Sequence, residues 1–219
     1  MLPNILTKTQ EQALLVIAHA DKLRERFYLT GGTALAGFYL GHRYSEDLDF
    51  FSFEEVDPMG VDVFLKTHKR ELGFNSFEYQ QSLNRNLYFL KYGGEELKME
   101  FTYFPFTQIE KPMEEHGLRI DSRLDIAVNK LFTIYQRSAA RDYIDLYILC
   151  EKERYTIKDL LTKARVKFDW HIDPLQLGSQ FFKAHEVADI PRMITNIKPE
   201  LWRGFFTREA ENLKDLIVE

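Results

Sequence analysis

The sequence predicts an α+β fold, with a mixed α/β lobe over residues 1–121 and an all-helical lobe over residues 122–219. The first lobe is indicated by two stretches of alternating apolar and polar residues, Asn86–Tyr92 and Glu96–Tyr103, on either side of a glycine pair. A glycine pair in this position is a strong signal for a β-hairpin. From Asp121 onward, apolar residues recur instead at the spacing expected of helices.

The other elements follow from apolar periodicity and from helix caps. Asp57 can cap a helix that has Pro58 at its first position, where a proline costs no hydrogen bond. In chain order, the first lobe is predicted to hold a helix over 8–25, a strand over 27–29, a helix over 33–40, a strand over 48–53, a helix over 58–72, a strand over 74–79, the hairpin and a strand over 118–120. The second lobe is predicted to hold helices over 122–137, 140–152, 156–168, 173–187 and 199–216.

The composition excludes several classes of protein. The net charge of -5 argues against a protein covered in basic surface, although a local basic groove is compatible with it. Cys150 is the one cysteine, so neither an internal disulfide nor a cysteine-based zinc site can form. No run approaches the roughly 18 apolar residues of a membrane helix. We therefore expect a cytoplasmic protein with no membrane partner.

Two aspartates, Asp47 and Asp49, are the first candidates for chemistry. Residues two apart on a strand point to the same face, so both carboxylates would share one face while Leu48 and Phe50 enter a core. Such a pair can hold hard divalent cations such as Mg²⁺. Taken alone, the pair would be explained better as a solvated acidic edge.

A glycine pair ahead of the aspartates changes that interpretation. Gly31 and Gly32 follow a predicted strand, and Thr33 begins a predicted helix. Backbone amides and a hydroxyl at a helix N-terminus can hold a triphosphate. Paired glycines alone would more often be a tight turn, but this order within one strand–helix–strand unit is much more specific.

The whole stretch resembles the first motif of DNA-polymerase-β-type nucleotidyltransferases. In detail, G-G-T-A-L followed by H-R-Y-S-E-D-L-D-F-F resembles the AbiEii/AbiGii toxin family of abortive-infection and toxin–antitoxin systems. The resemblance covers residues 28 to about 150. It implies a nucleotidyltransferase lobe with a small mixed sheet, completed by the helical lobe. It also implies an NTP substrate, Mg²⁺ or Mn²⁺ held by Asp47 and Asp49, and a cognate antitoxin.

The family requires a third carboxylate from a neighbouring strand. In the segment Leu97–Tyr103, alternation puts Lys98, Glu100 and Thr102 on the face opposite the apolar residues. Glu100 is therefore the candidate for the third metal ligand. The alternative is a half-exposed strand that carries ordinary charges.

A last match lies in the helical lobe. By resemblance, Lys130 contacts the phosphates of the nucleotide, and the segment with Arg141, Asp142 and Asp145 supports the site. A simpler interpretation of Arg141 and Asp145 is an ion pair within one helix, worth a few tenths of a kcal/mol. His42 and Arg43 could contact phosphate or acceptor, or could equally belong to a surface loop.

The resemblance predicts a metal-dependent toxin that transfers NMP from NTP to RNA, at the 3′ end of tRNA. RNA binding would need a confined basic groove, for which the candidates are Arg43, Lys98, Lys130, Arg137 and Arg141, extended by Lys163 and Lys167. Three alternatives stay open: transfer to a protein side chain or small molecule, a non-catalytic nucleotide-binding module, and a kinase-like phosphotransfer. The complete carboxylate set argues against the non-catalytic module.

Overall fold

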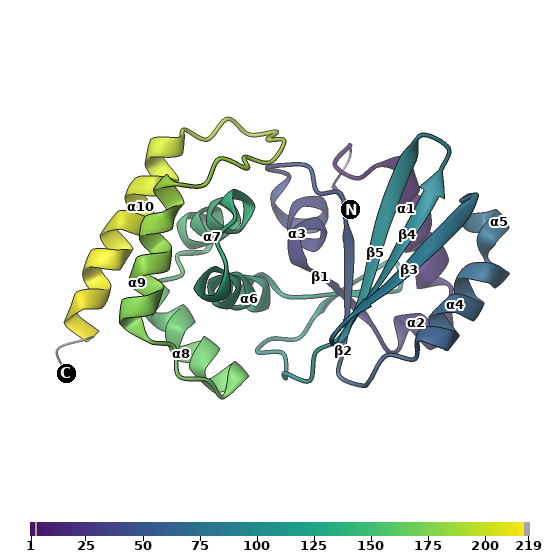
Figure 1. Ribbon diagram of the computed structural model, residues 1–219, viewed down its shortest axis with the longest axis horizontal. Coiled ribbons are helices and arrows are strands. Elements are labelled where there is room, and N and C mark those ends of the chain that lie inside the picture. The colour runs from purple at the N-terminus through teal and green to yellow at the C-terminus, as the bar shows by residue number, and fades with distance from the viewer. Residues whose placement is uncertain (3, 217–219) are drawn as a thin grey trace. The chain divides into compact units, whose positions relative to one another are not determined.

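The computed structural model describes residues 1–2 and 4–216 of the chain and divides into two compact units. The first unit runs from Met1 to Ser122, and the second begins at Arg123 (Figure 1). The first unit contains α1 (Lys8–Ala18), α2 (Asp21–Arg24), β1 (Tyr28–Thr30), α3 (Gly31–Ala34), η1 (Leu35–Leu40), β2 (Leu48–Ser52), α4 (Pro58–Thr67), α5 (Lys69–Leu72), β3 (Ser76–Ser82), β4 (Arg85–Tyr92), β5 (Glu95–Tyr103), β6 (Met113–Glu115) and β7 (Leu118–Ile120).

The strands of the first unit form one mixed sheet of seven strands in the described residues, in the order β3-β4-β5-β2-β1-β7-β6. The β2–β5 and β1–β7 pairs are parallel, and the other pairs are antiparallel. Helices α1, α4 and α5 lie on one side of this sheet, and α3 lies on the other (Figure 1). Along β2, the buried residues Leu48, Phe50 and Ser52 alternate with the half-buried Asp49 and Phe51.

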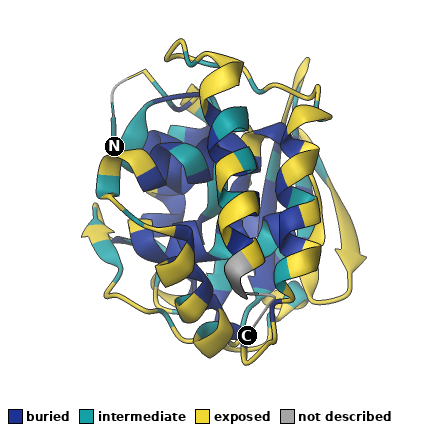
Figure 2. Ribbon diagram, turned by 90° about the vertical axis from the view of Figure 1, so that its left-hand side faces the viewer, coloured by how far each residue is buried: buried dark blue, intermediate teal, exposed yellow. Residues whose placement is uncertain are grey.

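The second unit is all-helical. It contains α6 (Arg123–Gln136), α7 (Ala140–Glu153), α8 (Ile157–Phe168), α9 (Pro174–Phe182), the 3₁₀ turn η2 (Lys183–His185), α10 (Pro199–Asn212) and the 3₁₀ turn η3 (Leu213–Leu216). Buried and exposed residues run as opposite stripes along the helices, as the periodicity requires (Figure 2). The predicted α+β class, with a mixed lobe followed by helices, is confirmed.

Four details differ from the sequence-based expectation. The segment predicted as one helix over 8–25 is broken between α1 and α2, and the helix predicted over 58–72 is broken at His68. A strand, β6, occupies residues 113–115, where we expected a loop. The helix expected over 33–40 begins earlier, at Gly31, and continues as a π-helix over Leu35–Leu40. This last difference places the glycine pair in the first turn of the helix.

Candidate nucleotidyltransfer site

The aspartate pair lies where strand β2 begins. Leu48 and Phe50 are 0% and 1% exposed, whereas Asp47 and Asp49 are partly exposed. The alternation predicted from the sequence is thus present, and both carboxylates belong to the polar face of the sheet. Leu48 and Phe50 fix the register of this strand, because a shift by one residue would bury two carboxylates and expose two core side chains.

Glu100 lies on β5, the parallel neighbour of β2, directly opposite Asp49. Its residue is 4% exposed, and it shares the polar face with Lys98 and Thr102. The parallel register therefore brings together the three carboxylates that the sequence singled out: Asp47 at the start of one strand, Asp49 within it and Glu100 beside it.

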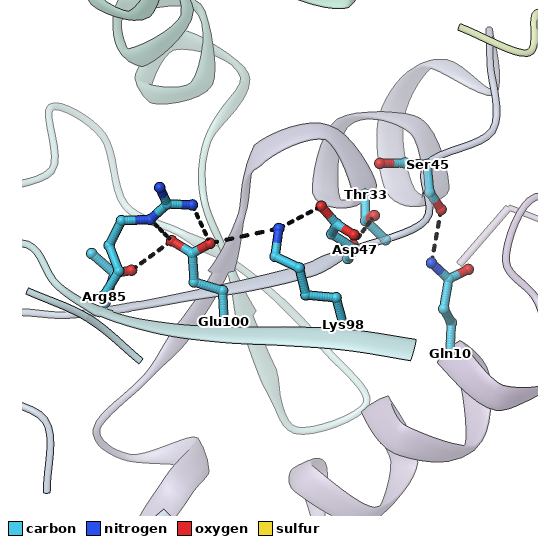
Figure 3. A network of polar contacts seen from close by, with 8 residues as sticks. Gln10, Thr33, Ser45, Asp47, Arg85, Lys98 and Glu100 are labelled. Atoms are coloured by element: carbon cyan, nitrogen blue, oxygen red, sulfur yellow. Dashed lines mark hydrogen bonds and ion pairs between the residues drawn. The ribbon is translucent and has the colours of Figure 1, made fainter. Parts of the chain in front are cut away.

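Two basic side chains of the same sheet contact two of these carboxylates, Asp47 and Glu100 (Figure 3). The Lys98 ammonium lies 2.7 Å from Asp47 Oδ2 and 3.8 Å from Glu100 Oε2. Arg85, on β4, donates two hydrogen bonds of 2.6 Å to the two oxygens of Glu100, one from Nε and one from Nη2. The Thr102 hydroxyl donates a third, of 2.9 Å, to Glu100 Oε1. Arg85 was not among the residues that the sequence singled out.

These contacts keep Glu100 ionised. Burial alone would raise the pKa of Glu100, but hydrogen bonding and charge from Arg85, with smaller contributions from Thr102 and Lys98, lower it overall. The hydrogen bond to Glu100 in turn raises the pKa of Arg85, against the opposing effect of burial. Glu100 and Arg85 thus form a mutually stabilised ion pair within the site.

The glycine pair approaches the carboxylates closely. Gly31 has a φ of +72°, and a Cβ on it would lie 2.5 Å from Asp49 Oδ2. A Cβ on Gly32 would lie 2.6 Å from a guanidinium nitrogen of Arg43 and 2.8 Å from Ser45 Oγ. A Cβ at either position would force a neighbouring side chain to move, and at Gly31 the backbone angle also favours glycine. The first turn of the helix therefore begins against Asp49.

Two hydroxyls and a carboxylate fix this turn. Thr33 is fully buried, and its hydroxyl donates to the backbone carbonyl of Asp47, so Thr33 positions the aspartate loop through its side chain (Figure 3). The Thr30 hydroxyl donates a 2.8 Å hydrogen bond to Asp121, which is also fully buried and accepts from Gln108 at 2.7 Å. Asp121 therefore anchors Thr30, the residue before Gly31.

The loop residues His42 and Arg43 are each 2% exposed, so neither belongs to a surface loop. Arg43 donates a 2.9 Å hydrogen bond to the carbonyl of Tyr44, and its guanidinium packs against Gly32. The Gln10 amide donates a 2.7 Å hydrogen bond to the carbonyl of Ser45 (Figure 3). The loop that carries the acidic pair is therefore held from both sides.

The second unit holds the remaining candidates in a cluster of its own. The Lys130 ammonium on α6 lies 2.6 Å from Asp142 Oδ1 and 2.8 Å from Asp145 Oδ2, both on α7. Lys130 is 8% exposed, Asp142 1% and Asp145 0%. Arg137, which is exposed, lies 3.3 Å from Asp142. Asp145 is therefore paired with Lys130 and not with Arg141, which is exposed on α7.

In the described residues, no three acidic, histidine or cysteine side chains converge closely enough to share a metal ion as they stand. The donor chemistry nevertheless fits one: Asp47, Asp49 and Glu100 supply carboxylate oxygens, the ligands that Mg²⁺ and Mn²⁺ prefer. One cation, the Lys98 ammonium, already lies within 4 Å of both Asp47 and Glu100. The same part of the chain holds no helix with the length and apolar character of a membrane span.

Comparison with known proteins identifies the family. A family model described as "Nucleotidyl transferase AbiEii toxin, Type IV TA system" matches residues 13–216. The chain belongs to the AbiEii nucleotidyltransferase toxin family. An uncharacterized protein of Aquifex aeolicus is 32% identical over 165 residues, which span 74% of this chain and 76% of that protein. The AbiEii match accounts for both units, since it reaches from α1 to the end of η3.

Solved structures share the fold of this AbiEii-family chain. JHP933 from Helicobacter pylori superposes with a TM-score of 0.62 at 22% identity, covering 97% of this chain and 94% of that one. MenT4, a nucleotidyltransferase toxin from Mycobacterium tuberculosis, gives a TM-score of 0.59 at 18% identity, covering 94% and 82%. This AbiEii-family chain is a nucleotidyltransferase; an NTP substrate and a divalent metal ion follow from its family in general terms.

Proposed function

We propose that this AbiEii-family enzyme transfers a nucleoside monophosphate from an NTP to a hydroxyl at the 3′ end of an RNA, specifically tRNA. Asp47, Asp49 and Glu100 are the proposed metal ligands, with Mg²⁺ or Mn²⁺ as the ion. The observation that supports this most is the register of β2 and β5, which sets Glu100 opposite Asp49 on the polar face. Bound divalent ions would offset negative charge on the phosphates and favour ionisation of the attacking hydroxyl.

The chain's own residues contribute by position and charge. The backbone of Gly31 and Gly32 is proposed to hold the β- and γ-phosphates, because it begins a helical segment directly beside Asp49. Thr33 contributes by holding the Asp47 backbone. The acceptor oxygen attacks the α-phosphorus, and the bond between this phosphorus and the oxygen that bridges the α- and β-phosphates breaks. Pyrophosphate leaves, and the proton of the hydroxyl passes to solvent.

Lys130, Asp145 and Arg141 remain proposed members of the site through the family resemblance. Lys130 would offset the charge of the leaving pyrophosphate. Its ammonium is held by Asp142 and Asp145, so a contact with phosphate requires that it be shared with, or released by, these carboxylates. Because Lys130 would contact phosphate and no metal ion, Lys130→Ala should weaken nucleotide binding. It should not alter metal binding in the absence of nucleotide.

An RNA acceptor requires exposed basic side chains that can contact its phosphates. Of the residues expected in a basic groove, Arg43 and Lys130 are buried and Lys98 is paired with Asp47. Arg137 and Arg141, both on the helical unit, are exposed. Of the two lysines expected to extend the groove, Lys167 is paired with Asp125, and Lys163 is half-buried. Contacts with phosphates of an RNA backbone would therefore depend on the two exposed arginines and on Lys163, and binding should weaken steeply with salt.

A direct experiment identifies the acceptor. Purified protein is incubated with each of the four α-labelled NTPs, Mg²⁺, and total RNA, total protein or a small-molecule extract, and the labelled product is separated by class. We expect label on the 3′ end of tRNA, and we expect Arg137→Ala to reduce RNA affinity more than NTP affinity. Label on protein or on a small molecule, with none on RNA for any NTP, would replace the RNA proposal with the corresponding acceptor.

The proposal also includes an antitoxin partner and a cytoplasmic location for the enzyme. The family description places its members in toxin–antitoxin systems, so a cognate antitoxin is part of the proposal. We further propose that the enzyme acts in the cytoplasm, where NTPs and tRNA are both present. Expression of the protein alone and together with a candidate antitoxin, with growth of the host as the readout, tests both the toxicity and its neutralisation; normal growth with the protein alone would contradict the toxin assignment.

A further inference from the structure

Lys98 occupies a position that neither the metal nor the phosphate assignments explain. It lies on β5, two residues before Glu100, and its side chain is 21% exposed. Its firm contact is with Asp47, at 2.7 Å, while its contact with Glu100 is long, at 3.8 Å. Since the neighbouring residues Leu97 and Met99 are buried in the core, the backbone of Lys98 is fixed and its ammonium stays on the polar face.

Arg85 makes a useful contrast, because it holds Glu100 much more tightly. Its two hydrogen bonds of 2.6 Å form a bidentate pair, the stronger geometry for a guanidinium and a carboxylate. Thr102 adds a third hydrogen bond to the same carboxylate. Of the two basic residues, Lys98 is thus the one that can leave its carboxylate partner at small cost.

A divalent ion on Asp47 would compete with Lys98 for the same oxygen. An ammonium and a divalent cation repel each other at that distance, so Lys98 must find another anion when the metal binds. The ion is expected to arrive with the triphosphate, whose proposed seat at Gly31 adjoins Asp49. Lysine has a flexible four-carbon stem with three donors, so its ammonium can change partners without movement of the backbone.

We propose that Lys98 binds the phosphates of the nucleotide, and that its ammonium neutralises Asp47 until the metal and nucleotide take that place. This inference rests on the proposed assignment of Asp47 and Asp49 as metal ligands. It makes Lys98 a substrate-binding residue with two successive partners. Removal of its charge should therefore raise the affinity for the metal ion alone and lower the affinity for the nucleotide in the presence of the metal.

The test uses the full chain with Lys98→Met, which keeps most of the stem and removes the charge. Lys91→Met is the matched control, because Lys91 lies on the adjacent strand β4 and pairs with Glu78 and Glu96 instead. Mn²⁺ is titrated alone by calorimetry, and the α,β-methylene analogues of the four NTPs are then titrated with Mn²⁺ present. For Lys98→Met we expect Mn²⁺ alone to bind about tenfold more tightly and the nucleotide analogue about tenfold more weakly, a change of about 1.4 kcal/mol each way. Lys91→Met should change neither.

Other outcomes overturn the inference. Tighter binding in both titrations would make Lys98 a competing cation only, and weaker binding in both would make it a structural residue. An unchanged pair of affinities would remove it from the site. If Lys98→Met fails to fold, Lys98→Gln carries the same test. Asp49→Ala separates the two proposals: if it leaves Mn²⁺ binding intact, the metal assignment itself fails, whereas loss of Mn²⁺ binding with no effect of Lys98→Met defeats this inference alone.

Discussion

The contact between Gly31 and Asp49 predicts how a single methyl group would disturb the site. An alanine at Gly31 would keep a φ of +72°, and its Cβ would lie 2.5 Å from Asp49 Oδ2. The carboxylate would have to rotate away, because carbon and oxygen do not approach so closely without a bond. The substitution thus displaces a proposed metal ligand without removing any of its atoms.

The destabilisation expected of Gly31→Ala has two parts, the cost of the backbone angle and the cost of moving Asp49. A second glycine, Gly73, isolates the cost of the backbone angle. A left-handed backbone costs a non-glycine residue about 1–2 kcal/mol. Gly73 has a φ of +77° with nothing within 4 Å of its hypothetical Cβ, so Gly73→Ala should show this cost alone. Gly31→Ala should add about 1 kcal/mol for forcing Asp49 off its rotamer. At about 2–4 °C per kcal/mol for a chain of this size, the melting temperature should fall further for Gly31→Ala than for Gly73→Ala.

Thermal denaturation and a transfer assay together check the reasoning. Gly31→Ala should lower transfer by at least about a hundredfold, since an ångström of misplacement at a reacting centre has that effect; Gly73→Ala should stay near wild type. In the background of Asp49→Ala, which removes the obstructing carboxylate, the extra destabilisation of Gly31→Ala should largely disappear. Equal destabilisation by the two glycine variants, with transfer retained in both, would refute the proposed contact.

Two further predictions concern the helical unit. Lys130→Met would leave the buried Asp142 and Asp145 without their ammonium and should destabilise the protein by about 3–5 kcal/mol, measured by denaturant unfolding. Burial raises the pKa of the Cys150 thiol to about 12, so a thiol reagent at pH 8.5 should modify the unfolded protein but not the folded one. Because the unfolded thiol ionises first, the stability that this group contributes is present below about pH 9 and is lost as the pH rises toward 12.

A control variant accompanies the first of these predictions. Lys66→Met breaks an exposed pair with Asp62 on α4 and should cost less than about 0.5 kcal/mol. If Lys130→Met were equally mild, the cluster around Lys130 would not be the buried ion-pair network described above. Rapid modification of Cys150 in the native protein, at the rate seen in denaturant, would contradict its burial.

Local patterns were enough to predict most of the fold. The capping aspartate and proline at α4, the glycine pair of the hairpin and the apolar stripe of α6 each depend on residues close together in sequence. The breaks within the first and third predicted helices were missed, because apolar periodicity continues across them. The strand β6 is three residues long and forms only by pairing with β7, so its own sequence carries little signal.

For the site, the alternation in two strands was sufficient to place Asp49 and Glu100 on polar faces, and the family resemblance paired them. Arg85 could have been found as well. A two-residue turn at Gly93-Gly94 pairs Tyr92 with Glu95, and counting back along the hairpin sets Arg85 opposite Thr102, on the same face as Glu100. That register argument was available from the hairpin signal alone.

Other features depended on contacts between distant segments. Asp121 accepts from Thr30, 91 residues away, and no periodicity links the two. Lys130 and Asp145 were each singled out, but their pairing follows from how α6 packs on α7. The alternative interpretation, an ion pair between Arg141 and Asp145, relied only on their four-residue spacing, which is the local rule on a helix.

Single-turnover transfer by Asp49→Asn tests the central claim most directly. The substitution keeps the shape of the side chain and removes the charge on which metal binding and catalysis are proposed to depend. With labelled NTP, Mg²⁺ and the acceptor that wild type labels, we predict a loss of about a hundredfold to a thousandfold, the size seen when a group that stabilises transition-state charge is removed. The melting temperature should stay near that of wild type. Asp62→Asn, an exposed change on α4, should leave transfer unaltered. Transfer by Asp49→Asn within tenfold of wild type would contradict the assignment of this strand as the catalytic one.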